Sequence, residues 1–121
     1  MYNMGLIKTY KDLDIWQKGM DLSVLIYEVT KKFPVDEKFG LISQMRRCAV
    51  SIPSNIAEGS ARNSYKEFVK FLHIALGSLA ELETQLLLAT RLGYLEKDFQ
   101  IQTEEIRRKT LNYAKHLKTK Q

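Results

Sequence analysis

The chain has 121 residues, of which 45% are hydrophobic, 27% are charged and one is a cysteine, and its formal net charge is +5. This length and composition suit a single globular domain over residues 1–121, and they argue against a disordered tail or a two-domain enzyme. No apolar run approaches the roughly 18 residues of a membrane span, and the N-terminus lacks the apolar block of a signal peptide, so we expect a cytoplasmic protein with no membrane partner.

The first predicted element is an amphipathic helix over about residues 13–33. Hydrophobic positions recur at alternating steps of four and three from Ile15 to Phe33, opposite a polar face, and this is the periodicity of a helix with one buried stripe. Phe33 precedes Pro34, and proline disfavours helical geometry at the residue before it. We therefore expect the helix to end there and a short turn to follow.

A second helix is predicted over about residues 36–59, because the same apolar spacing continues there and Gly59 can end it. Cys48 lies in its apolar stripe, which predicts a small buried hydrophobe. As the only cysteine, it excludes an internal disulfide and a cysteine-based zinc site.

The second helix contains a proline well inside its length. Pro53 removes one backbone donor and leaves the carbonyl of Ala49 without its helical partner, a loss on the order of 3 kcal/mol in an ordinary helix interior. We expect the small polar residues beside it, Ser51, Ser54 and Asn55, to hydrogen-bond the freed groups.

The third helix, over about residues 64–92, has signals at both ends. Ser64 and Glu67 have the spacing of a capping box, and Gly93 can form the C-cap. Its heptad seam leaves further apolar residues outside the stripe, so either the bundle wraps it on most sides or part of its surface packs on another subunit. We favour assembly, and we expect the oligomer interface to include Leu25, Leu76 and Leu87.

The fourth helix, over about residues 97–118, is more polar and carries the excess charge. Residues 1–106 hold 13 basic and 14 acidic side chains, whereas residues 107–121 hold 6 basic and none that are acidic. Such a cluster attracts phosphates, but cations are also favoured at helix C-termini by the helix dipole. The sequence leaves both interpretations open.

Four helices joined by short turns predict an all-α, antiparallel up-down-up-down four-helix bundle. The two histidines, His73 and His116, lack the glutamate three residues earlier that a di-iron bundle requires. No glycine-rich phosphate loop or serine-enzyme motif is present. We therefore expect no catalytic residues, no metal site, no cofactor and no enzyme activity.

The remaining functional signal is a set of cations that an up-down bundle could gather at one pole. Phosphate binding competes with structural roles for some of them, because Arg62 follows Glu58 by four residues and a guanidinium near Pro53 could bond freed carbonyls. The candidate nucleic-acid-binding residues are Arg46, Arg47, Arg62, Lys66, Arg107, Arg108, Lys115 and Lys118.

Several segments resemble the bacterial four-helix-bundle proteins called 23S rRNA intervening-sequence proteins. The resemblance covers about residues 10–95 and is most specific in the run Ser51-Ile-Pro-Ser-Asn-Ile-Ala-Glu-Gly59. It implies a four-helix bundle that forms a homopentameric ring, and it extends to the basic accessory variability protein of diversity-generating retroelements. The family brings no catalytic residues with it.

Together these observations predict a non-enzymatic homo-oligomer that binds nucleic acid, with RNA as the expected class, through a basic surface. The alternative is a protein-protein interaction scaffold, or an accessory subunit for an RNA-processing enzyme or a reverse transcriptase. Such a scaffold would show an exposed apolar patch, for which Trp16 and Tyr27 are candidates.

Overall fold

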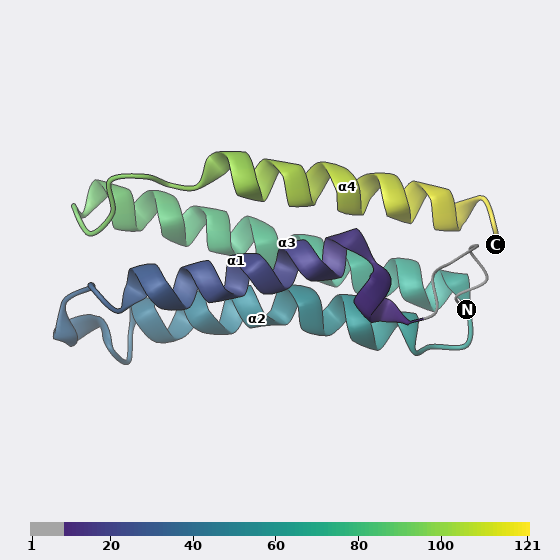
Figure 1. Cartoon of the computed structure of the whole chain (residues 1–121), viewed down its shortest axis with the longest axis horizontal. Coiled ribbons are helices and arrows are strands. Elements are labelled where there is room, and N and C mark those ends of the chain that lie inside the picture. Colours follow the sequence, from purple (N-terminus) through teal and green to yellow (C-terminus); the bar gives the residue numbers. More distant parts are fainter. Residues whose placement is uncertain (1–8) are drawn as a thin grey trace.

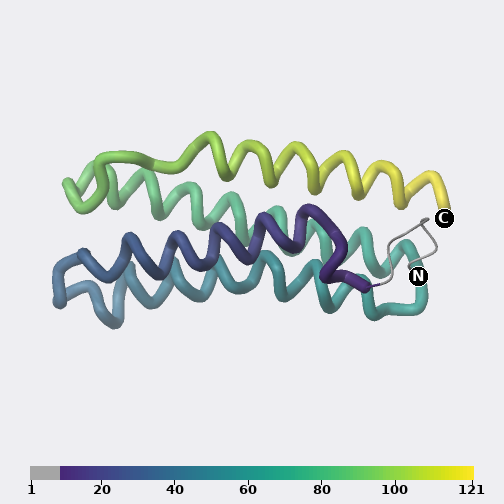
Figure 2. Tube along the Cα trace, in the orientation of Figure 1, coloured from purple at the N-terminus to yellow at the C-terminus, as the bar shows by residue number. Residues whose placement is uncertain are grey.

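The computed structural model describes residues 9–121, and these form a four-helix bundle as predicted. The long helices lie side by side, and the chain reverses direction at each of the three connections between them (Figures 1 and 2). They are α1 (Asp14–Thr30), α2 (Leu41–Ser60), α3 (Tyr65–Arg91) and α4 (Gln100–Lys118), with 3-10 turns η1 (Tyr10–Asp12) and η2 (Val35–Glu37). Helix α3 packs on α2 and α4, and α1 packs on α2 and less extensively on α4, so α1 and α3 lie diagonally.

The predicted apolar stripes meet in one hydrophobic core. Ile26, Met45, Leu72 and Leu117, one from each helix, are fully buried. Cys48 is buried beside them as expected, and its removal from water, reinforced by nearby Glu81, raises the pKa of its thiol to about 11.

The second helix begins at Leu41 rather than near residue 36. Residues 35–37 instead form η2, and the Glu37 carboxylate caps α2 by accepting from the Leu41 backbone N–H at 3.1 Å. The same carboxylate accepts from the Tyr94 hydroxyl at 3.0 Å, a bond that raises the pKa of Tyr94. It thereby ties the α1–α2 connection to the α3–α4 connection.

The two glycines expected to end helices behave differently. Gly93 has φ +81°, and the N–H groups of Gly93 and Tyr94 reach the carbonyls of Thr90 and Ala89 at 3.0 and 2.9 Å, so it forms the predicted cap as a Schellman motif. Gly59 does not end α2, which continues to Ser60. A Cβ at Gly59 would lie 2.6 Å from the Phe71 Cβ of α3, so glycine is needed there for close helix packing.

The start of α3 is capped by Ser64, whose Oγ accepts from the backbone N–H of Glu67 at 3.1 Å. This is the serine half of the predicted capping box. By length and composition α3 could also cross a membrane, a criterion that core helices of soluble proteins meet as well.

Pro53 is accommodated by α1 and not by its neighbours in α2. The carbonyl of Ala49, which loses its helical donor, accepts from the Ser23 Oγ of α1 at 3.0 Å. The expectation that Ser51, Ser54 or Asn55 would serve it is therefore wrong: Asn55 donates to the Ser51 carbonyl and hydroxyl instead. The proline is tolerated because a hydroxyl on another helix replaces the missing amide.

Candidate nucleic-acid interface

The structure spreads the predicted cations along the bundle, with two near the middle of α4, Arg107 and Arg108, and the others nearer one end or the other. Arg46 and Arg47 lie in the second turn of α2, and the Arg46 Nε donates to Thr30, the last residue of α1, at 2.9 Å. Lys66, in the first turn of α3, and Lys118, the last residue of α4, lie at the opposite end (Figure 1). The predicted set therefore does not form one patch.

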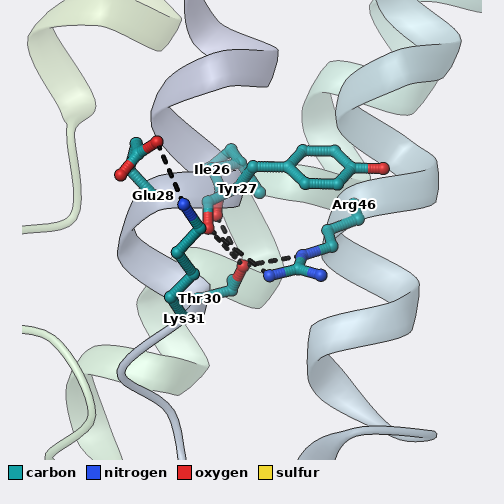
Figure 3. A network of polar contacts seen from close by, with 6 residues as sticks. All are labelled: Ile26, Tyr27, Glu28, Thr30, Lys31 and Arg46. Carbon is teal, nitrogen blue, oxygen red and sulfur yellow. Dashed lines mark hydrogen bonds and ion pairs between the residues drawn. The ribbon is translucent and has the colours of Figure 1, made fainter.

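The Arg46 side chain is folded onto α1. Its Nη2 donates to the Tyr27 carbonyl at 3.4 Å, its guanidinium carbon lies 4.5 Å from the centre of the Tyr27 ring, and its Nε bonds the Thr30 hydroxyl (Figure 3). That hydroxyl in turn donates to the Ile26 carbonyl at 2.7 Å. Of the two roles open to Arg46, these contacts favour the structural one, since they hold the C-terminus of α1 against α2.

Two further predicted cations already have anionic partners. Arg107 pairs with Glu83 of α3 and, at 2.9 Å, with Glu104 of its own helix. Arg62 lies 3.8 Å from Glu58 and its guanidinium stacks at 4.8 Å from the centre of a phenylalanine ring on α3. A phosphate would have to compete with these contacts, so both positions contribute less to an anion-binding surface.

The other predicted cations are exposed and, within residues 9–121, have no ion-pair partner. Arg108 and Lys115 are seven residues apart, so they share the outer face of α4 about 10 Å from each other along the axis. Lys115 and Lys118, in the last turn of α4, and Lys66, in the first turn of α3, form what we call the cationic end, and Arg108 extends it toward the middle of α4. Arg47 is equally exposed but stands apart, in the N-terminal half of α2.

The three predicted interface leucines lie in different surroundings. Leu25 lines a crevice of about 220 Å³ between α1 and α4, where Lys18 and Glu105 pair at 3.3 Å and the bond to Glu105 raises the pKa of Lys18. Leu76 is half-buried, and Leu87 is 45% exposed on α3. Leu87 thus lies on an open surface and Leu25 does not.

The structure also contains an apolar groove that the sequence analysis identified only in part. It runs between α1 and α2 on the outside of the bundle, has a volume of about 440 Å³ and is lined mainly by Trp16, Met20, Val24, Tyr27, Val50 and Pro53. We call it the α1–α2 groove. Its signal was a second apolar stripe on the first helix, Trp16, Met20, Val24 and Tyr27 at steps of four, four and three, beside the core stripe.

Among the residues that the structure describes, no group of three or more His, Cys, Asp or Glu side chains could hold a metal ion. The titratable groups with shifted pKa values are the buried Cys48, Tyr94 at the Glu37 cap and Lys18 at the α1–α4 crevice. They lie on separate parts of the bundle and do not form one site. The fold and surfaces define a small four-helix-bundle protein whose distinctive features are a cationic end and an apolar side groove.

The chain belongs to the family of 23S rRNA-intervening sequence proteins, because the family model matches residues 11–118. A crystal structure from Bacteroides thetaiotaomicron VPI-5482, described as a protein of unknown function from the S23 ribosomal protein family, is 28% identical to this chain. The match covers 87% of this chain and 92% of that one, with a TM-score of 0.61. Comparison with curated proteins gives no match. These findings confirm the resemblance inferred from the sequence.

Proposed function

We propose that the protein is a non-enzymatic, cytoplasmic homo-oligomer that binds RNA through the cationic end. The observation that carries this proposal is a contrast among the residues that the structure describes. Arg107 is held by two glutamates, whereas four cations are exposed there without an acidic partner, namely Lys66, Arg108, Lys115 and Lys118. Exposed cations on neighbouring helices attract a phosphate backbone without reading its bases.

The family provides the second line of support. The family that matches this chain is named for intervening sequences of 23S rRNA. The sequence resemblance to that family implies a homopentameric ring. In a ring, the few phosphate contacts of each subunit act together, so that weak individual binding becomes useful avidity.

The test is binding of a fluorescently labelled RNA hairpin, and of a single strand of equal length, at 50 to 300 mM salt. We expect log Kd to change linearly with log salt, by about 0.7 to 0.9 for each phosphate that is neutralised. The variant Lys66→Gln/Lys115→Gln/Lys118→Gln should bind more weakly and with a shallower salt slope, while its mass in light scattering stays that of the wild type.

The matched control is Lys32→Gln/Lys38→Gln/Lys97→Gln, which removes the same charge from exposed positions in the α1–α2 and α3–α4 connections, near the opposite end of the bundle. It should retain most of the affinity. Salt-insensitive binding, or equal losses in the two triple variants, would contradict a specific role for the cationic end.

A further inference from the structure

Three aromatic rings lead from the core to the surface at the cationic end. Phe68 of α3 is 1% exposed, and the half-buried Tyr113 of α4 packs edge-on against it, with 5.7 Å between the ring centres. The exposed ring of His116 follows on the same helix, with its centre 6.3 Å from that of Tyr113 and 30° between the two planes. A flat ring is therefore presented to solvent and is supported from behind by two others.

The other histidine of the chain gives a contrast. His73 is also exposed, on α3, but no aromatic ring packs against it within residues 9–121. Contact with Tyr113 restricts the orientations of the His116 ring, so a planar ligand that stacks on His116 loses less side-chain entropy than one that stacks on a free ring. Of the two histidines, His116 is the one arranged as a stacking surface.

Exposed polar and cationic side chains surround this ring. Asn112 precedes His116 by four residues, and Arg108 and Lys115 lie four before and three after Asn112, so these side chains share one side of α4. All of them are exposed, and within residues 9–121 the two cations have no ion-pair partner. An aromatic ring beside cations that can hold phosphates is the combination by which proteins bind single-stranded nucleic acid.

Stacking of this kind distinguishes a single strand from a duplex. The bases of a duplex are paired and stacked on one another, and taking one out has an energetic cost, whereas the bases of a single strand are already accessible. A surface of cations alone would instead favour the duplex, because its two strands carry more charge along the same length. The His116 ring therefore adds a preference that charge does not provide.

We infer that His116 stacks on a base of single-stranded RNA whose phosphates are held by Arg108 and Lys115. This inference rests on the proposed function and names the class of RNA that the cationic end selects. The contact is independent of sequence, because every base has a face on which an aromatic ring can stack.

The binding experiment compares a labelled single strand with a strand of the same length that carries abasic sites in place of its bases. His116→Ala should weaken binding of the base-bearing strand about 5- to 150-fold, the range found when one base-stacking ring is removed, and should leave binding of the abasic strand nearly unchanged. His116→Phe keeps a ring and should restore most of the affinity. The matched control, His73→Ala, should bind both strands like the wild type, and circular dichroism checks that each variant is folded.

Proton NMR provides a second readout that does not depend on a variant. The chain has two histidines, so their ring protons are resolved and can be assigned from the two alanine variants. The base-bearing strand should shift the His116 ring protons upfield, because they then lie over the face of a base. The abasic strand should not do so, and the His73 protons should move little with either strand.

The outcomes separate this inference from the proposal on which it rests. If the wild type binds the two strands equally, if a blunt duplex with the same number of phosphates binds more tightly than the single strand, or if His116→Ala weakens binding of both strands alike, the stacking contact is wrong while phosphate binding stands. If the wild type binds neither strand nor the duplex, RNA binding itself fails.

Discussion

The hydrogen bond between Ser23 and the carbonyl of Ala49 gives the sharpest test of how α2 tolerates its proline. The Ser23 hydroxyl is buried, and it shares its proton between the carbonyls of Gly19 and Ala49, at 2.9 and 3.0 Å. The Gly19 carbonyl still has its own helical partner, as part of α1. The Ala49 carbonyl has none, since its helical donor would be the amide of Pro53.

Replacing Ser23 with alanine should therefore destabilise the protein by about 1–3 kcal/mol, the cost of leaving a buried acceptor unsatisfied. In a Pro53→Ala background the same replacement should cost less than about 1 kcal/mol, because the new amide at position 53 donates to Ala49. The expected coupling energy between the two positions is about 1–2 kcal/mol. Ser54→Ala, at the exposed position beside the proline, should change stability by less than about 0.5 kcal/mol.

The assay is urea unfolding followed by circular dichroism for the wild type, both single variants and the double variant. One protein concentration is used throughout, because assembly would otherwise contribute to the apparent stability. The cycle cancels the packing that Pro53→Ala loses and the helix propensity that it gains. Equal costs of Ser23→Ala in the two backgrounds would refute the reasoning.

Three further predictions follow from the packing. Gly59→Ala should lower stability by about 1–3 kcal/mol in thermal unfolding, since its Cβ would lie 2.6 Å from that of Phe71; an unchanged melting temperature would contradict the close contact. Arg46→Lys should lower the free energy of unfolding measured in urea by about 1–2 kcal/mol, because a lysine cannot both hydrogen-bond the end of α1 and stack on the Tyr27 ring. The same change at the exposed Arg47 should lower it by less than about 0.5 kcal/mol. Alkylation of Cys48 by iodoacetamide should be slow at pH 8 and rise about tenfold per pH unit toward its pKa of about 11; a fast reaction at pH 8 would show that the thiol is not held protonated.

The features that could be predicted from the sequence are those set by residues near one another in the chain. Apolar spacing gave four helices, and the caps at Ser64 and Gly93 use donors and acceptors within a few residues. The misplaced start of α2 has a tertiary cause, because the capping carboxylate of Glu37 is also held by Tyr94, which lies in the α3–α4 connection at the same end of the bundle.

The roles that could not be predicted from the sequence are those that depend on contacts with other helices. Three positions in α2 were singled out by residue type, but their roles depend on what packs beside them: Pro53 on a serine of α1, Gly59 on a phenylalanine of α3, and Arg46 on the end of α1. The same holds for the candidate nucleic-acid residues. Charge alone made Arg107 and Arg108 equivalent, yet the glutamates of α3 and α4 occupy the first and leave the second exposed.

The proline that made α2 unusual in sequence also shapes the α1–α2 groove. Ser23 and Pro53 both line it, and an added Cβ at Gly19 would lie 3.3 Å from the Pro53 Cδ, so glycine lets α1 and α2 approach closely at this point. An ordinary helical residue at position 53 would provide its own amide and would not need Ser23. The proline and the serine that serves its freed carbonyl therefore both belong to the α1–α2 groove, and local departures from helix preference are expected where function imposes another requirement. On this argument, the proline belongs to the close packing of α1 on α2 and to the groove beside it, rather than to the cationic end.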